Sequence, residues 1–188
     1  SKEVKPDTAE LANDFVRYTF TTRGGGISSV ELIEKDGKKL KYPKKIGDGS
    51  KGPVRMEWTR GRLPLLALEP GTGKPLDNAP NAERPYHDTP SNYSIAKAGD
   101  TVTLTAPFGQ WRVTKTFTMG KNYLLRATVT VSNDSNNTLG EVPFYLITGT
   151  AHEPVASSRM MGQGYGTMWY DGEEETSVGS GWFDNYRM

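Results

Sequence analysis

The chain lacks cysteine and holds only two histidines, His87 and His152, in 188 residues. The absence of cysteine excludes disulfide bridges, thiolate metal sites and a cysteine nucleophile. The histidines lie far apart without metal-ligand spacing, so the sequence predicts no metal site. No apolar run reaches about 18 residues, so no segment is predicted to span a membrane. A net charge of +1 gives no reason to expect nucleic acid or acidic lipid as the main partner.

Long amphipathic helical patterns are also missing, and short alternating segments take their place. In DFVRYTFTT, the apolar residues Val16, Tyr18 and Phe20 fall on one face of an extended chain. The same alternation recurs along the sequence and predicts roughly ten to fourteen short strands. The segment DTAELAN, residues 7–13, is expected to form at most one loose helical turn. Together these patterns predict an all-β fold with little helix, an antiparallel sandwich or barrel.

The clearest predicted strand pair joins residues 110–119 to residues 123–133. Two alternating rows define it: Trp111, Val113, Phe117 and Met119 in the first strand, and Leu125, Ala127, Val129 and Val131 in the second. The turn between them contains Gly120, Lys121 and Asn122. Each row is expected on one face of its strand, and Trp111 is expected in the core.

Two further segments are predicted to be turns or loops. Asp36-Gly37 is a strong two-residue hairpin signal between short strands. Residues 69–92 contain five prolines, at positions 70, 75, 80, 85 and 90, and predict one long irregular excursion. A loop of this length is unusual in a compact domain and is typical of a mobile or functional segment.

Three consecutive glycines, Gly24 to Gly26, are the strongest local signal for a ligand site. A phosphate-binding loop requires a strand, a glycine run closed by Lys-Ser or Lys-Thr, and then a helix. Here Ile27-Ser28-Ser29-Val30 follows and has the pattern of a strand. We therefore interpret the glycines as a bulged turn between two strands.

Other candidate catalytic residues do not assemble into a recognisable motif. His152 with a distant glutamate could supply acid–base chemistry, but nothing in the sequence brings them together. SVGSGW, residues 177–182, resembles a nucleophile elbow without the helix that should follow it. The acidic run Glu173–Glu175 is typical of a solvated turn. Asn133-Asp134-Ser135 and Asn136-Asn137-Thr138 match glycosylation acceptors, which matter only in a eukaryotic secreted protein. The sequence thus assigns no catalytic, cofactor-binding or metal-binding residue.

The tryptophans Trp58, Trp111, Trp169 and Trp182 could line a sugar-binding face if several were exposed. Trp169 and Trp182 lie in glycine-rich segments, which makes them the better candidates for exposure. Burial in the core is the more frequent outcome for tryptophan.

Two stretches together resemble a known family. NDFVRYTFTTRGGGISSVEL (13–32) resembles the opening of the large periplasmic domain of the bacterial membrane-protein insertase YidC. GQWRVTKTFTMGKNYLLRATVTVSNDSNNTL (109–139) resembles its later core, where a Lys-Thr-Phe strand precedes a Tyr-led strand and an Asn-Ser turn. Lys115, Phe117, Tyr123 and Asn133 match that pattern.

The resemblance implies a β-supersandwich related to galactose-mutarotase-like folds. It implies a linker over residues 1–13 after a transmembrane helix, and a periplasmic sandwich over residues 14–188. The family's domain is usually longer, so the end at Met188 indicates a truncation or a shorter variant.

The implied function is that of a non-catalytic module on the periplasmic side of the bacterial inner membrane. It would contact accessory subunits of the Sec translocon and nascent membrane proteins, without a cofactor and without nucleic acid. Two other classes stay open. A mutarotase-like sugar epimerase or carbohydrate-binding sandwich would require an aromatic concave face, with His152 and a glutamate converging. A secreted adhesion or structural β-domain would have no ligand.

Overall fold

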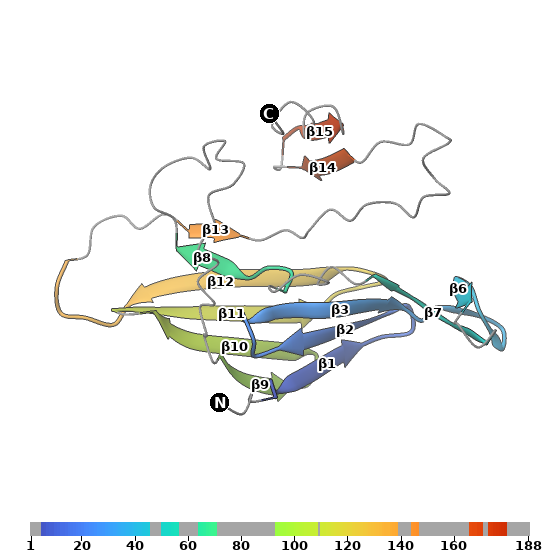
Figure 1. The fold of residues 1–188 in the computed structure, drawn as a ribbon, viewed down its shortest axis with the longest axis horizontal. Helices are drawn as coiled ribbons and strands as arrows, with labels where there is room; N and C mark the ends of the chain where they lie inside the picture. Colours follow the sequence, from blue (N-terminus) through green and yellow to red (C-terminus); the bar gives the residue numbers. More distant parts are fainter. Residues whose placement is uncertain are drawn as a thin grey trace. The chain divides into compact units, whose positions relative to one another are not determined.

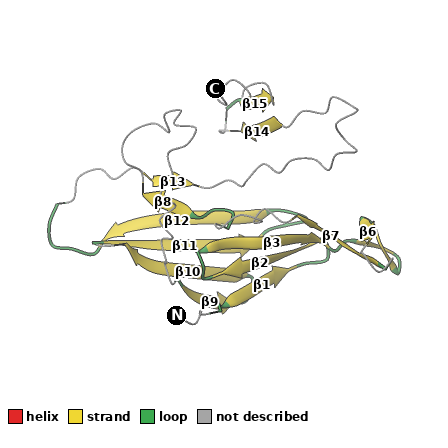
Figure 2. Ribbon diagram, in the orientation of Figure 1, coloured by secondary structure: helices red, strands yellow, loops and turns green. Residues whose placement is uncertain are grey.

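The computed structural model describes residues 5–45, 50–56, 64–70, 93–108, 110–138, 144–146, 166–170 and 173–179. All regular elements among these residues are antiparallel strands, and no helix occurs there (Figure 2). The all-β antiparallel fold predicted from the sequence is therefore confirmed. In the described part of the chain, no helix has the length and apolarity needed to cross a bilayer.

Contacts within the chain divide it into two units. The first comprises residues 1–73 and 86–150, and the second comprises residues 74–85 and 151–188. In the second unit, the described strands β14 (Gly166–Tyr170) and β15 (Glu175–Gly179) pair as one hairpin. The core, the buried cluster and the groove described below belong to the first unit.

The first unit contains a five-stranded sheet built from the N-terminal part of the chain (Figure 1). Its strands, in spatial order, are β1 (Thr8–Ala12), β2 (Val16–Thr21), β3 (Gly26–Leu32), β7 (Lys51–Met56) and β6 (Pro43–Lys45). The small hairpin β4 (Lys35–Asp36) and β5 (Lys39–Leu40) follows β3 and turns at Gly37, which has a φ of +61°. The Asp36-Gly37 hairpin expected from the sequence is thus confirmed.

A four-stranded meander forms the second sheet of this unit. In spatial order it runs β12 (Leu125–Asn133), β11 (Trp111–Met119), β10 (Thr101–Phe108) and β9 (Ser94–Ala98). A short two-stranded ribbon pairs β8 (Leu68–Pro70) with β13 (Phe144–Leu146). Strand β8 occupies the beginning of the predicted 69–92 loop, and residues 71–92 lie outside the described part.

The core of the first unit is a single cluster with residues from both sheets. Its members share the inward positions of their strands; they include Val16, Tyr18, Phe20, Ile27, Val30, Val102, Leu104, Val113 and Phe117. The rings of Phe20 and Phe117 lie 4.8 Å apart between centroids. Burial of each such aromatic side chain contributes about 2–3 kcal/mol. The alternating residues that predicted β2, Val16, Tyr18 and Phe20, are the side chains that β2 contributes to this core.

The N-terminal segment differs from its prediction. Thr8–Ala12 form strand β1, whereas at most one loose helical turn was expected over residues 7–13. The strand pairs with β2 from Thr8↔Thr21 to Ala12↔Arg17, and Leu11 is 2% exposed in the core. Tertiary contacts explain this difference. The burial of Leu11 and the backbone hydrogen bonds between β1 and β2 stabilise the strand by more than the weak helical propensity of a short polar segment could stabilise a helix.

The apolar row of β12 shares one face, as predicted, but it is only partly covered. Register with β11 places Leu125, Ala127, Val129 and Val131 on the core side of β12. However, Ala127 and Val129 are exposed and the other two are half-buried. Trp111 is likewise half-buried rather than buried in the core. Strand β12 is the edge of its sheet, so fewer neighbours cover it.

Candidate functional site

The most unusual buried group is Lys115 on β11. Its neighbours Val113 and Phe117 on the same face are 0% exposed, and so is Lys115. The Lys115 ammonium donates hydrogen bonds to two backbone carbonyl oxygens, that of Gly25 at 2.5 Å and that of Leu66 at 2.8 Å. It also lies 4.8 Å from the centroid of the Tyr93 ring, within cation–π range. The alternation of β11 therefore points the Lys115 side chain into the core. There its ammonium group contacts the Gly25 and Leu66 carbonyl oxygens and the face of the Tyr93 ring.

The glycine turn between β2 and β3 is shaped by this cluster. Gly24 and Gly25 have φ values of +70° and +58°, which glycine adopts readily. A Cβ on Gly25 would lie 2.3 Å from the Tyr93 ring, and one on Gly26 would lie 2.3 Å from the Leu65 carbonyl oxygen. Strand β3 begins at Gly26, so no helix follows the glycines. The prediction of a turn rather than a phosphate loop is confirmed.

The segment that faces the glycine turn is held in a specific conformation. Ile27 and Leu65 exchange backbone hydrogen bonds of 2.9 and 3.0 Å. The next residue, Leu66, has a φ of +66°, an uncommon value for a residue with a branched side chain. The carbonyl oxygen of this same residue, Leu66, accepts the hydrogen bond from the Lys115 ammonium. Lys115 thus connects the second sheet to the turn of the first sheet and to residues 64–67.

Burial lowers the pKa of Lys115 to about 7. The two carbonyl oxygens and the ring face act in the opposite direction, because they favour the charged ammonium. Burial also raises the pKa of the Tyr93 hydroxyl. The cluster is enclosed by packed backbone and side chains. Its arrangement fits a structural tie between the sheets rather than a nucleophile or a general base.

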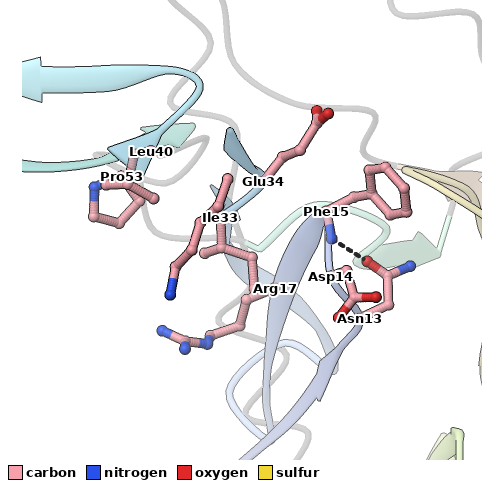
Figure 3. A pocket seen from close by; sticks show the side chains of 9 residues that line it. Asn13, Asp14, Phe15, Arg17, Ile33, Glu34, Leu40 and Pro53 are labelled. Carbon is pink, nitrogen blue, oxygen red and sulfur yellow. Dashed lines mark hydrogen bonds between the residues drawn. The ribbon is translucent and has the colours of Figure 1, made fainter. Parts of the chain in front are cut away.

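A groove of about 640 Å³ opens at one end of the five-stranded sheet. Its walls come from the β1–β2 turn, the end of β3, the β4–β5 hairpin and β7, and are lined by Asn13, Asp14, Phe15, Arg17, Ile33, Glu34, Lys35, Leu40 and Pro53. Figure 3 shows Arg17 and Ile33 between Leu40 and Pro53 on one side and Asp14 on the other. Arg17 pairs with Glu31 at 2.9 Å, so its charge is partly neutralised. The lining mixes both charge signs with apolar side chains, which is typical of a contact surface.

Asn13 connects this end of the sheet to the β11–β12 turn. Its side-chain oxygen accepts hydrogen bonds from the backbone N–H groups of Phe15 and Val16, at 2.8 and 3.0 Å (the first is drawn in Figure 3). Its side-chain nitrogen donates to the Asn122 carbonyl oxygen at 2.6 Å. Asn122 itself has a φ of +56°, a value that asparagine tolerates better than most residues.

Several candidate residues named from the sequence lie outside the described part. These are the two histidines, His87 and His152, and two of the tryptophans considered for a sugar-binding face, Trp58 and Trp182. Trp169 lies in β14, and Ser177 of the elbow-like segment lies in β15. Glu173 and Glu174 are exposed and connect β14 to β15, consistent with the predicted acidic turn. The Asn133 side chain accepts a hydrogen bond from the Ser135 N–H at 2.8 Å, a local turn.

Within the described ranges, no group of three or more His, Asp or Glu side chains could hold a metal ion. The burial of Lys115 was not predicted from the sequence. The available signal was its position between Val113 and Phe117, where alternation requires an inward side chain.

The described first unit is an antiparallel β-sandwich whose buried polar cluster joins its sheets. The YidC periplasmic domain family model matches residues 8–180, all but the first seven and the last eight residues. The chain therefore belongs to the YidC periplasmic domain family, as the resemblance implied. It is a module of a YidC-type membrane-protein insertase and lies on the periplasmic side of the membrane protein. The match begins at Thr8, the first residue of β1. Neither a curated protein nor a solved structure matched the chain.

Proposed function

We propose that this domain is a non-catalytic docking and scaffolding module at the bacterial inner membrane. It contacts accessory subunits of the Sec translocon and nascent membrane proteins. Through these contacts it assists the insertion and folding of the nascent membrane proteins. It performs no chemistry of its own and uses no cofactor. Membership in the YidC periplasmic domain family supports the insertase context.

The open edge at β12 is the observation that carries this proposal. This nine-residue strand pairs with β11, and no other described strand pairs with its second side. Edge strands present backbone N–H and C=O groups that another chain can pair with. An extended peptide can add to such an edge through main-chain hydrogen bonds.

The side chains of β12 also favour docking. Val129 is 37% exposed although its register with Lys115 places it on the core side of the sheet. Ala127 on the same row is exposed as well. A partner strand on this edge would cover that row, which gives apolar contact in addition to backbone pairing.

A pair of variants on β12 tests the proposal. Val129→Lys places a charge on the partly exposed apolar row, while Thr130→Lys places the same charge on the opposite face of the same strand. We expect Val129→Lys to weaken binding of the 188-residue chain to purified Sec accessory subunits by at least about tenfold. We expect Thr130→Lys to change binding much less. The absence of wild-type binding at micromolar concentration would contradict the docking role.

A further inference from the structure

Positive charge is concentrated at one end of the first unit, although the whole chain is nearly neutral. Residues 34–41, which contain the hairpin β4–β5, carry four lysines against two carboxylates, a net charge of +2; the lysines are Lys35, Lys38, Lys39 and Lys41, and the carboxylates are Glu34 and Asp36. All four are exposed. Lys41 pairs with Glu34 at 2.8 Å, and this contact raises the pKa of the Lys41 ammonium, which stays charged. No ion pair of Lys38 or Lys39 occurs among the described residues.

Exposed hydrophobic side chains gather at the same end. Four large hydrophobic side chains are exposed in the described part of the chain, and three of them are Tyr42, Tyr123 and Leu124. Leu124 is 70% exposed in the β11–β12 turn, where its backbone N–H donates to the carbonyl oxygen of the exposed Lys121 at 3.0 Å.

Glu34 connects the basic hairpin to the hydrophobic turn. One of its carboxylate oxygens accepts a hydrogen bond from the Lys41 ammonium, and the other accepts one from the Tyr123 hydroxyl. The ring of Phe15 packs edge-on against the Tyr123 ring, with centroids 5.5 Å apart. The Tyr18 hydroxyl donates to the Tyr123 carbonyl at 2.6 Å. The two turns therefore form one continuous surface, with a fixed arrangement of lysines, tyrosines and a leucine.

We infer that this surface docks onto a lipid bilayer that carries anionic headgroups. Lysines near such a membrane are attracted by its negative surface potential within about a Debye length. Tyrosine places its ring at the headgroup level with its hydroxyl in water, and an exposed leucine can enter the acyl boundary. The membrane lies next to a periplasmic domain of an insertase at all times. This contact would hold the domain in one orientation over the bilayer.

This inference is separate from the docking of proteins at β12. The membrane surface comprises the β4–β5 hairpin and the β11–β12 turn. Val129 lies four residues beyond the first residue of β12 and is not part of it. Each surface can therefore be altered without altering the other.

Vesicle co-sedimentation of the 188-residue chain tests the inference. We expect the chain to bind vesicles of phosphatidylglycerol and phosphatidylcholine, to bind pure phosphatidylcholine vesicles much less, and to dissociate as salt is raised. Lys38→Gln combined with Lys39→Gln should weaken binding by about 25-fold, because each lysine near an anionic surface contributes about a fivefold factor. The control, Lys5→Gln combined with Lys97→Gln, removes the same charge from exposed positions elsewhere and should change binding much less.

A second pair of variants tests the hydrophobic part of the surface. Leu124→Ser should weaken vesicle binding by about tenfold, and Leu124→Met should retain it. Equal binding to anionic and neutral vesicles would overturn the inference. Equal losses in the two lysine pairs would also overturn it, because binding would then depend only on total charge. Loss of Sec-subunit binding in the Lys38/Lys39 variant, without vesicle binding by the wild-type chain, would assign this surface to a protein instead.

Discussion

The buried Lys115 makes the stability of the domain depend on pH in an unusual direction. Its pKa falls from the ordinary value of 10.5 to about 7 in the folded protein. Between these two values the unfolded chain binds more protons than the folded chain. The free energy of unfolding therefore rises with pH across this window, and protonation of Lys115 opposes folding below it.

The expected size of this effect follows from proton linkage. One pKa unit corresponds to about 1.4 kcal/mol, so the full shift is worth about 5 kcal/mol. At pH 7 about half of the folded molecules are already deprotonated at Lys115. The linkage relation then gives about 2 kcal/mol of added stability between pH 7 and pH 9. Burial raises the pKa of the Tyr18 and Tyr93 hydroxyls, so these two buried groups do not contribute to the rise.

Urea unfolding at pH 7, 8 and 9 measures this gain. Lys115→Met keeps a long unbranched side chain and removes the titrating group, so its free energy of unfolding should lose this rise. Lys97→Met changes an exposed lysine on β9 and should keep the rise. A flat profile in the wild-type domain, or the same rise in Lys115→Met, would show that Lys115 is not the source of a pH-dependent stability. The first result would mean that the carbonyls and ring fully offset the cost of burial.

Two further predictions concern the turns of the first unit. Gly25→Ala should lower the free energy of unfolding by about 3 kcal/mol or more, because its Cβ would enter the Tyr93 ring and its φ is positive. Gly37→Ala, with a similar φ and open space around it, should cost only about 1 kcal/mol in the same urea titration. Asn13→Ala should cost about 2 kcal/mol, because two N–H groups and one carbonyl lose their partner. Equal costs for the two glycine variants, or an unchanged midpoint for Asn13→Ala, would contradict these contacts.

Strict alternation made the central strands predictable. Val16, Tyr18 and Phe20 repeat with the period of a strand, and β2 buries all three. The Asp36-Gly37 dipeptide predicted its hairpin because few residue pairs adopt that turn easily. The glycine run was recognised as a turn because no helix pattern followed it.

Features set by distant parts of the chain could not be predicted in the same way. Strand β1 depends on a ladder with β2 and on a core position for Leu11, neither of which a short polar segment reveals. The inward position of Lys115 follows from alternation, but its partners Gly25 and Leu66 lie 90 and 49 residues away. The exposure of Val129 depends on its strand being the edge of a sheet, which the local sequence does not encode.

Photo-crosslinking in membranes that contain the full-length insertase tests the docking proposal most directly. A photoreactive residue at position 129 on β12 is compared with one at position 97 on β9, at the other edge of the same sheet. We expect adducts to Sec accessory subunits or nascent membrane proteins from position 129 and few from position 97. No adduct from position 129, or equal yields from both positions, would contradict it.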